Sequence, residues 1–386
     1  MDSGNESDEF AEGSKKDQAK ANKMPTYGEE ADQQYDAILS ALFEKVPPGE
    51  GDEFAAVKPW LGAIKEPKPK PKVNKKAPAE KFDIDWVYGY RSEEARMNAS
   101  FNSQGQAVYP TAALGVVFDY HTMKQKYFGG GETKFSGRKQ DDESKDGHSD
   151  DVTALCVSFS RKMVASGQNG QKPLVFLWDA ETCKIIGKKR LPKGARLVTA
   201  IGVSATDQYI AAADAAEKIT AHLFKVDGGV APIASVQINM KVVHLAFNPA
   251  SEETFATAGK DHMALCVYDG AKTVKKTMGK AGKGKIESQC SIAFSNDPAH
   301  AASVLTGSSA GEIVHWTNGE ISKTYPNNKG TVDSIALRKD ATAGGEICLV
   351  GGKDATLTVY RFDGNLEKLW TVEVDAAPRS CDLFNG

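Results

Sequence analysis

The sequence has few cysteines, no long hydrophobic run and no recognisable leader. Its six cysteines are scattered and form no C-x-x-C pair. This spacing offers neither a disulfide framework nor a zinc motif, and it is typical of a reducing compartment. No apolar run approaches the roughly 18 residues of a membrane helix, and the N-terminus lacks the basic and apolar regions of a signal peptide. We therefore expect a cytoplasmic protein with no membrane association.

The sequence also lacks the patterns that carry enzymatic or metal chemistry. It contains no Ser/His/Asp or paired-carboxylate arrangement, and its histidines show no metal-ligand spacing. The stretch 279–286 follows a phosphate-binding loop until Ile286 replaces the required Ser or Thr, and a strand follows instead of a helix. The acidic run 141–151 lacks the ligand spacing of an EF-hand loop. We expect no catalytic residue, cofactor or metal; an enzyme with its site at the mouth of a channel is the least favoured alternative.

What the sequence does contain is a repeat of roughly 45 residues. Short alternating apolar runs end in an aromatic residue at intervals of 46, 44, 48 and 44 residues. A period of this length, built from four short strands, is typical of a β-propeller blade. We predict an all-β WD-repeat propeller of about six to seven blades. The closing aromatic residues are Trp178, Phe224, Tyr268, Trp316 and Tyr360.

One unit carries both halves of the WD signature, Gly147-His148 before its first strand and Trp178-Asp179 at the end of its third. We expect His148, Trp178 and Asp179 to be structural, with His148 forming hydrogen bonds within its blade. The blades span 147–386, and residues 82–146 form a partial first blade. The run 378–384 resembles the first strand of another blade. Either the N-terminal strand near Trp86 completes that blade, or the chain is a piece of something longer.

The N-terminal 81 residues differ in composition from the rest. Residues 1–33 are acidic and polar, which predicts a disordered tail or an arm that folds on binding. Residues 34–64 combine a short amphipathic helix with an aromatic linker, in which Trp60 either packs on the propeller or anchors a partner. Residues 65–81 alternate Lys and Pro, which favours an extended chain. This arm is either a solvated spacer or a contact for a polyanionic surface, through Lys65, Lys68, Lys70, Lys72, Lys75, Lys76 and Lys81.

The run Trp86-Val87-Tyr88-Gly89-Tyr90-Arg91, followed by WD-type blades, resembles the HELP motif of the echinoderm microtubule-associated protein-like (EMAP-like) family. The linker 51–64 is also similar to the segment that precedes that motif in long members. The resemblance implies microtubule binding and, in several branches, residence in cilia. It implies a mainly structural role for Trp86, Tyr88, Gly89, Tyr90 and Arg91. The sequence departs from the family in having no second propeller and no N-terminal coiled coil.

These observations lead to one functional hypothesis and one alternative. The hypothesis is a non-enzymatic microtubule-associated protein that docks on tubulin, in the cytoskeleton and in ciliary or axonemal doublets. The seven lysines would contact acidic tubulin surface, Trp60 would anchor, and the propeller would face the lattice or other axonemal or cytoskeletal proteins. The alternative is a general scaffold for protein complexes without tubulin contact. The net charge of −3 and the absence of aromatics among the lysines argue against nucleic acid.

Overall fold

The computed structural model describes residues 68–69, 83–92, 95–130, 147–170, 172–282, 284–327, 329–340 and 345–384. The predicted tail 1–33 and the helix and linker 34–64 lie outside the described residues. So does the Lys/Pro segment 65–81, apart from Lys68 and Pro69. The chain divides into two compact units, 1–83 with 135–141 and 84–134 with 142–386. The second unit contains all the described strands.

The second unit is built from six four-stranded antiparallel sheets, each formed by strands that follow one another along the chain. The first three sheets contain β1 (Ser100–Phe101), β2 (Ala107–Thr111), β3 (Leu114–Asp119) and β4 (Lys124–Phe128); β5 (Val152–Val157), β6 (Met163–Gln168), β7 (Leu174–Asp179) and β8 (Ile185–Arg190); and β9 (Val198–Val203), β10 (Tyr209–Asp214), β11 (Thr220–Lys225) and β12 (Ala234–Gln237).

The next three sheets repeat the arrangement, with a short 3₁₀ helix, η1 (Pro298–His300), inserted in the second of them. They contain β13 (Val242–Phe247), β14 (Thr254–Gly259), β15 (His262–Tyr268) and β16 (Val274–Met278); β17 (Gln289–Phe294), β18 (Ser303–Ser308), β19 (Glu312–Thr317) and β20 (Glu320–Pro326); and β21 (Val332–Lys339), β22 (Glu346–Gly352), β23 (Thr356–Phe362) and β24 (Leu366–Glu373).

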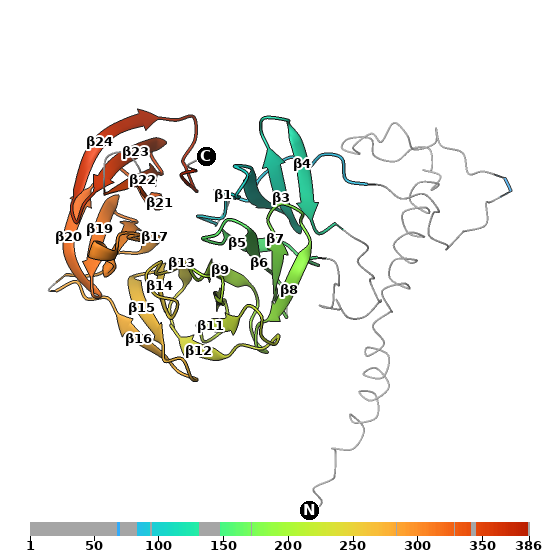
Figure 1. The fold of residues 1–386 in the computed structure, drawn as a ribbon, viewed down its shortest axis with the longest axis horizontal. Helices are drawn as coiled ribbons and strands as arrows, with labels where there is room; N and C mark the ends of the chain where they lie inside the picture. The colour runs from blue at the N-terminus through green and yellow to red at the C-terminus, as the bar shows by residue number, and fades with distance from the viewer. Residues whose placement is uncertain are drawn as a thin grey trace, which may run out of the picture. The chain divides into compact units, whose positions relative to one another are not determined.

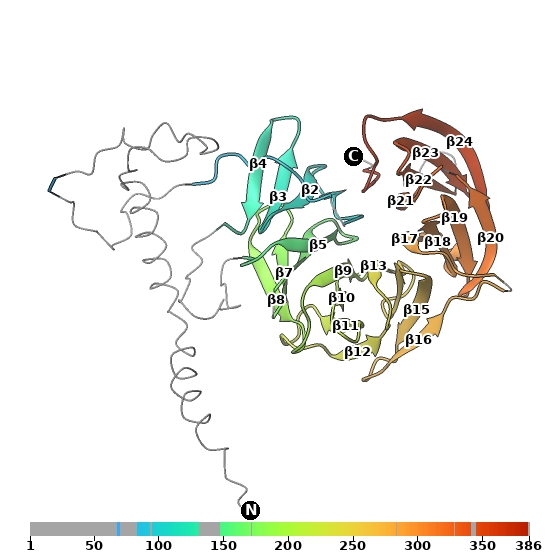
Figure 2. The same cartoon turned by 180° about the vertical axis from the view of Figure 1, so that it is seen from behind.

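The six sheets stand around a central axis, and both views show the first strand of each sheet nearest that axis (Figures 1 and 2). Adjacent blades meet face to face, so the second strands of the second to sixth blades are almost wholly buried, whereas the outermost strand β24 is exposed along nearly its whole length. The expectation of an all-β propeller of six to seven blades is confirmed, with six complete sheets in the described chain.

Small residues in the second strands allow this close approach. A Cβ added to Gly167 in β6 would lie 2.5 Å from the Val198 side chain, and one added to Gly307 in β18 would lie 2.4 Å from Val332 Cγ1. Val198 and Val332 each begin the innermost strand of the following blade. Glycine at the end of the second strand is therefore required where neighbouring blades converge.

The hydrophobic core consists of separate clusters, each placed between two neighbouring blades. The cluster between the first two blades includes Phe128 of β4 stacked on Trp178 of β7, with ring centroids 4.9 Å apart and an interplanar angle of 2°. Such pairs add about 0.5–1.5 kcal/mol beyond the area they bury. Four further clusters join the successive blades up to β21–β24. The repeated aromatic residues thus hold the blades together.

The C-terminal segment occupies the place where a seventh innermost strand would lie. A Cβ on Gly351 of β22 would be 2.7 Å from Pro378, as one on Gly307 would meet Val332. Ser334 Oγ donates to the Pro378 carbonyl at 2.8 Å, matching the bond from Ser291 to the Val332 carbonyl. Both views place the C-terminal end between the sixth sheet and the first (Figures 1 and 2).

The N-terminal residues that meet this segment include Met97 and Asn98. Met97 N donates to the Arg379 carbonyl at 3.0 Å, and Asn98 N donates to Ser380 Oγ at 3.1 Å. In the N-terminal segment that was expected to complete the last blade, Trp86 itself contacts Phe118 of the first sheet, while the Tyr90 hydroxyl lies 3.1 Å from Ser380 Oγ. A small cluster that includes Cys381 and Leu383 joins the segment to the sixth sheet.

A buried carboxylate fixes the end of the chain to both neighbours. The Asp382 side chain accepts hydrogen bonds from both terminal nitrogens of Arg161, at 2.7 and 3.0 Å, and from Arg338 Nη2 at 3.1 Å. It also accepts from Ser100 Oγ and Phe101 N of β1. Burial alone would raise the pKa of Asp382, but these hydrogen bonds and the two guanidinium charges outweigh it and leave the pKa below its usual value.

Candidate binding site at the mouth of the channel

The HELP-type run lies along the first blade. The Trp86 ring meets Phe118 of β3 edge-on at 5.8 Å and Tyr88 at 6.2 Å. Gln125 of β4 fixes the backbone of the run by accepting from Val87 N and donating to the Val87 carbonyl. Tyr88 is 85% exposed. The segment therefore has one face against the first sheet and one aromatic ring in solvent.

The second half of the run connects the first blade to the ends of the ring. Gly89 has a φ of 98°, a left-handed conformation that suits glycine. The Tyr90 hydroxyl donates to Asn98 Oδ1 and lies 3.1 Å from Ser380 Oγ, and burial raises the pKa of this phenol. Arg91 Nη1 pairs with Asp151 Oδ2 at 2.9 Å, just before β5. These contacts hold the run in place between the first two blades and the C-terminal segment.

The WD-signature residues form a buried hydrogen-bond chain in the second blade. His148 Nε2 lies 2.7 Å from Ser166 Oγ, which also accepts from Trp178 Nε1 at 3.0 Å. His148 Nδ1 lies 2.9 Å from Gln168 Oε1. Asp179 Oδ1 accepts from the backbone N–H of Glu181 and Thr182, and the Thr182 bond is the main cause of its lowered pKa.

The fifth blade contains an equivalent of this hydrogen-bond chain, which was not predicted from the sequence. Trp316 Nε1 donates to Thr306 Oγ1 at 2.7 Å, and Thr306 donates to Gln289 Oε1. Gln289 thus takes the position of the signature histidine, and Thr306 that of Ser166. The signal available in the sequence was the small hydroxyl residue in the second strand, twelve or ten positions before the aromatic residue.

A recurrent β-bulge encircles one mouth of the central channel. In five blades the pairing between the first and second strands skips the second residue of the first strand. A bulge of this kind redirects a side chain without ending the strand. We call these residues the bulge ring: Thr153, Thr199, Val243, Cys290 and Asp333.

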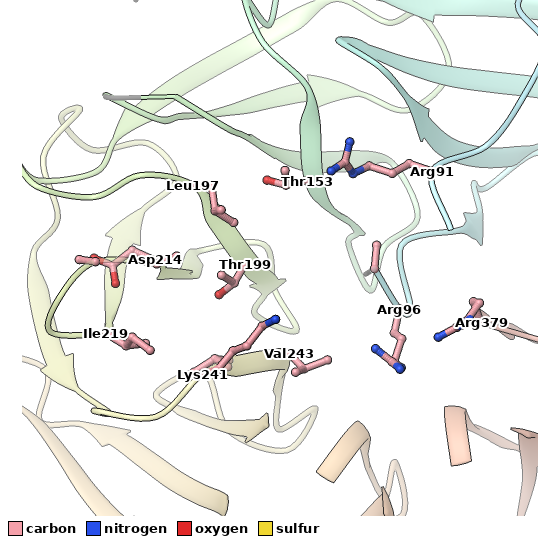
Figure 3. A pocket seen from close by; sticks show the side chains of 14 residues that line it. Arg91, Arg96, Thr153, Leu197, Thr199, Asp214, Ile219, Lys241, Val243 and Arg379 are labelled. Atoms are coloured by element: carbon pink, nitrogen blue, oxygen red, sulfur yellow. The ribbon is translucent and has the colours of Figure 1, made fainter. Parts of the chain in front are cut away.

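A cavity of about 610 Å³ opens at this mouth. Thr153, Thr199 and Val243 of the bulge ring line it, together with the apolar side chains of Leu197 and Ile219 (Figure 3). Its volume falls within the roughly 300–1,000 Å³ that is usual for ligand sites. Other parts of the wall come from the β10–β11 turn, from the N-terminal segment before β1 and from Arg379 in the C-terminal segment after β24, so both ends of the described ring contribute to the cavity.

Positive charge predominates in the lining of this cavity. Arg96 and Arg379 both pair with the fully buried carboxylate of Asp333: Arg96 Nε lies 2.8 Å from Oδ1, and Arg379 Nη1 lies 3.3 Å from Oδ2. Two guanidinium groups therefore share one negative charge. Among the residues that the structure describes, none accepts a hydrogen bond from the other N–H groups of these two arginines.

Lys241, just before β13, contributes a third cation. Its side chain is exposed, and within the described chain no carboxylate or carbonyl lies within bonding distance of its ammonium. Figure 3 shows Lys241 and Arg96 extending into the same space from opposite sides. The one carboxylate among the described lining residues, Asp214, accepts from Thr220 N and lies 3.0 Å from His222 Nε2. Sequence analysis did not identify the three cations.

Of the predicted site residues that the structure describes in the second unit, Arg91 is the one that lines this cavity. Trp60, Lys65, Lys70, Lys72, Lys75, Lys76 and Lys81 lie outside the described residues. Within the described ranges, no cluster of three or more His, Cys, Asp or Glu side chains could hold a metal ion. None of the helices that the structure describes is long and apolar enough to span a bilayer.

The fold, the WD-type hydrogen-bond chain and the HELP-type run together define a WD-repeat β-propeller with a HELP segment. The family model described as the HELP motif matches residues 77–116. The sequence is 34% identical over 362 residues to a ciliary WD repeat-containing protein, ctxp80, of Euplotoides octocarinatus, covering 92% of this chain and 48% of that protein. It is 26% identical over 300 residues to the 77 kDa echinoderm microtubule-associated protein of Strongylocentrotus purpuratus, covering 74% of this chain and 40% of that protein.

These matches confirm the resemblance to the EMAP-like family that the sequence indicated. The chain spans about half or less of the length of these relatives. A chain in the crystal structure of the mitotic checkpoint complex has the same fold, with a TM-score of 0.58, 13% identity, and coverage of 85% of this chain and 91% of that chain. At that identity, the likeness concerns the fold alone.

Proposed function

We propose that this protein is a non-enzymatic microtubule-associated protein whose propeller is attached to tubulin by the N-terminal arm. The observation that carries the proposal is the resemblance to the family together with the charge segregation of the chain. Seven lysines stand within residues 65–81 of a chain whose net charge is only −3. A cluster of this kind gives salt-sensitive attraction to an acidic surface.

We further propose a location in the cytoskeleton, including ciliary or axonemal doublets. A relative that covers most of this chain is named as a ciliary protein, and another as a microtubule-associated protein. In this hypothesis Trp60 anchors beside the lysines, and the propeller contacts the lattice or other axonemal proteins. The rigid packing between blades would let the propeller hold a fixed orientation once attached.

The test is co-sedimentation with purified microtubules. We compare the full chain with a form that lacks residues 1–81 and with a variant in which Lys65, Lys68, Lys70, Lys72, Lys75, Lys76 and Lys81 are changed to Gln. Changing the same seven lysines to Arg is the matched control, because it keeps the charge. We expect the Gln variant to lose about tenfold or more in affinity at moderate salt, since several weak contacts of about 0.5 kcal/mol each are removed.

The other outcomes distinguish between the arm, the propeller and the general scaffold. Equal binding by the full chain and the truncated form would move the tubulin site onto the propeller and contradict the role of the arm. Absence of binding by the full chain at low salt would remove the direct contact with tubulin. The general scaffold would then become the better description of the protein.

A further inference from the structure

We propose that the cavity at the bulge ring binds an acidic peptide segment of a partner protein. The residues that line this site do not include the arm lysines, so the proposal does not depend on the arm. Three features of the cavity within the described chain support it: arginine donors without a protein acceptor, an ammonium without a protein partner, and an apolar wall.

The first feature is the set of donors on Arg96 and Arg379. A guanidinium offers five N–H groups in a planar fork that fits a carboxylate. Each of these two arginines contacts Asp333 through one nitrogen, at 2.8 Å for Arg96 and 3.3 Å for Arg379. The remaining donors have no acceptor among the described residues, and both arginines line the cavity. A ligand that brings oxygen atoms would satisfy them.

The second feature is the balance of charge. Arg96, Arg379 and Lys241 carry three positive charges near the single negative charge of Asp333. Asp214 lies on the far side of the cavity, where Thr220 N and His222 occupy its oxygens. The side of the cavity between Lys241 and Arg96 therefore has an excess of two positive charges, which one or two ligand carboxylates would neutralise.

The third feature distinguishes a peptide from a nucleic acid. Leu197, Ile219 and Val243 form an apolar wall beside the cations, while Thr153 and Thr199 supply hydroxyl groups. The aliphatic part of a glutamate and the backbone of an extended chain fit such a mixed surface. A nucleic-acid backbone carries a phosphate at every step and needs several cations in a row. Two excess charges in a recessed mouth do not provide them.

The experiment uses the full chain with the seven arm lysines changed to Gln, so that the arm cannot bind the peptide. A fluorescein-labelled oligo-glutamate peptide is titrated with this protein at low ionic strength, and binding is followed by anisotropy. We expect Lys241→Glu to weaken binding about tenfold, because a charge-assisted hydrogen bond becomes a repulsion. Lys241 is exposed, so its replacement leaves the fold intact, which the melting temperature verifies.

Lys275→Glu is the matched control, because Lys275 is an exposed lysine on the outer strand β16. We expect it to change the peptide affinity by less than about twofold. No binding in the background protein, or equal losses in both variants, would overturn the proposal. A labelled oligothymidylate that bound as tightly and lost affinity equally at Lys241 would make the cavity a general polyanion site, and the assignment to peptides would be wrong. Microtubule co-sedimentation is scored separately, so failure of the arm hypothesis is distinguishable.

Discussion

At the scale of single residues, the propeller depends on buried polar groups that are held neutral. His148 is buried and His244 is half-buried, and burial lowers the pKa of each to about 4 from an ordinary value of 6.5. His244 Nδ1 must be unprotonated, since it accepts from Ile292 N of the next blade at 3.0 Å. Protonation of either ring would place an uncompensated charge between packed strands.

This neutrality predicts a loss of stability in mild acid. Because the folded pKa of His148 is depressed below the unfolded value of 6.5, its contribution is fully present above pH 6.5 and is lost as the pH falls towards about 4. At pH 5 the loss for one such histidine is about 2 kcal/mol.

The measurement is the free energy of unfolding from urea titrations between pH 7.5 and pH 5. We expect His148→Gln to reduce the slope of this free energy against pH by about one proton, whatever it does to the absolute value. His121→Gln, at an exposed position on the β3–β4 turn, is the matched His-to-Gln control. A His148→Gln slope equal to that of the original protein would contradict the assignment.

At the scale of the strand, the geometry of the ring is set by how closely neighbouring blades approach. Second-strand glycines stand where the next blade begins, so even one methyl group there has no room. The outer strands have no such restriction: a Cβ on Gly187 of β8 would meet only Leu177 Cδ1, at the ordinary distance of 3.7 Å. The same substitution should therefore have opposite consequences at the two positions.

We predict that Gly307→Ala lowers the free energy of unfolding by about 1–3 kcal/mol, since the added methyl group overpacks the interface with Val332. Gly187→Ala should be neutral or slightly stabilising, because alanine loses less backbone entropy than glycine on folding. Paired urea titrations of the two variants provide the comparison. Equal effects at both positions would mean that the blades can shift to admit the methyl group.

At the scale of the whole molecule, closure of the ring depends on residues from both ends of the described chain. Asp382 accepts hydrogen bonds from Arg161 of the second blade, from Arg338 of the sixth blade and from the backbone of β1. Asp333 forms ion pairs with Arg96 and Arg379. The contacts of Asp382 with Arg161 and with β1, and the contact of Asp333 with Arg96, join segments that lie more than 200 residues apart.

We predict that Asp382→Asn costs about 3–5 kcal/mol, because it leaves Arg161 without the buried counter-ion that it holds at 2.7 Å. Hydrogen exchange should accelerate first in residues 97–101 and 378–384, where the ends meet. The control is Asp227→Asn, whose exposed pair with Lys225 at 3.8 Å should contribute less than about 0.5 kcal/mol. Uniform acceleration over all blades, or no acceleration, would contradict a local role in closure.

The features recovered from the sequence are those with a short period. The aromatic residue at the end of each third strand repeats because it fills the same interface each time, so Trp178 and Trp316 predicted the blades. His148, Ser166 and Trp178 are close in sequence, and their blade could be recognised from the signature alone.

The cavity could not be derived in this way. Arg96 and Asp333 are 237 positions apart, and only closure of the ring brings them within 2.8 Å. Arg96 does not belong to the repeated pattern, because it precedes the first strand of the first blade. The bulge at the second position of five innermost strands could have been predicted from the sequence. Thr153, Thr199 and Asp333 are polar residues at a position where a buried strand would otherwise be apolar.

The bulge ring also determines where the sequence of such a protein can diverge. Each of its five side chains leaves the ladder at a point where no partner residue stands opposite. Substitution there alters the chemistry of the mouth while the hydrogen bonds between strands stay as they are. Threonine, valine, cysteine and aspartate already share this single structural position within one chain. Divergent selection, or a protein engineer, could therefore change the recognition specificity at the four positions other than Asp333, whose ion pairs close the ring, and leave the architecture unchanged.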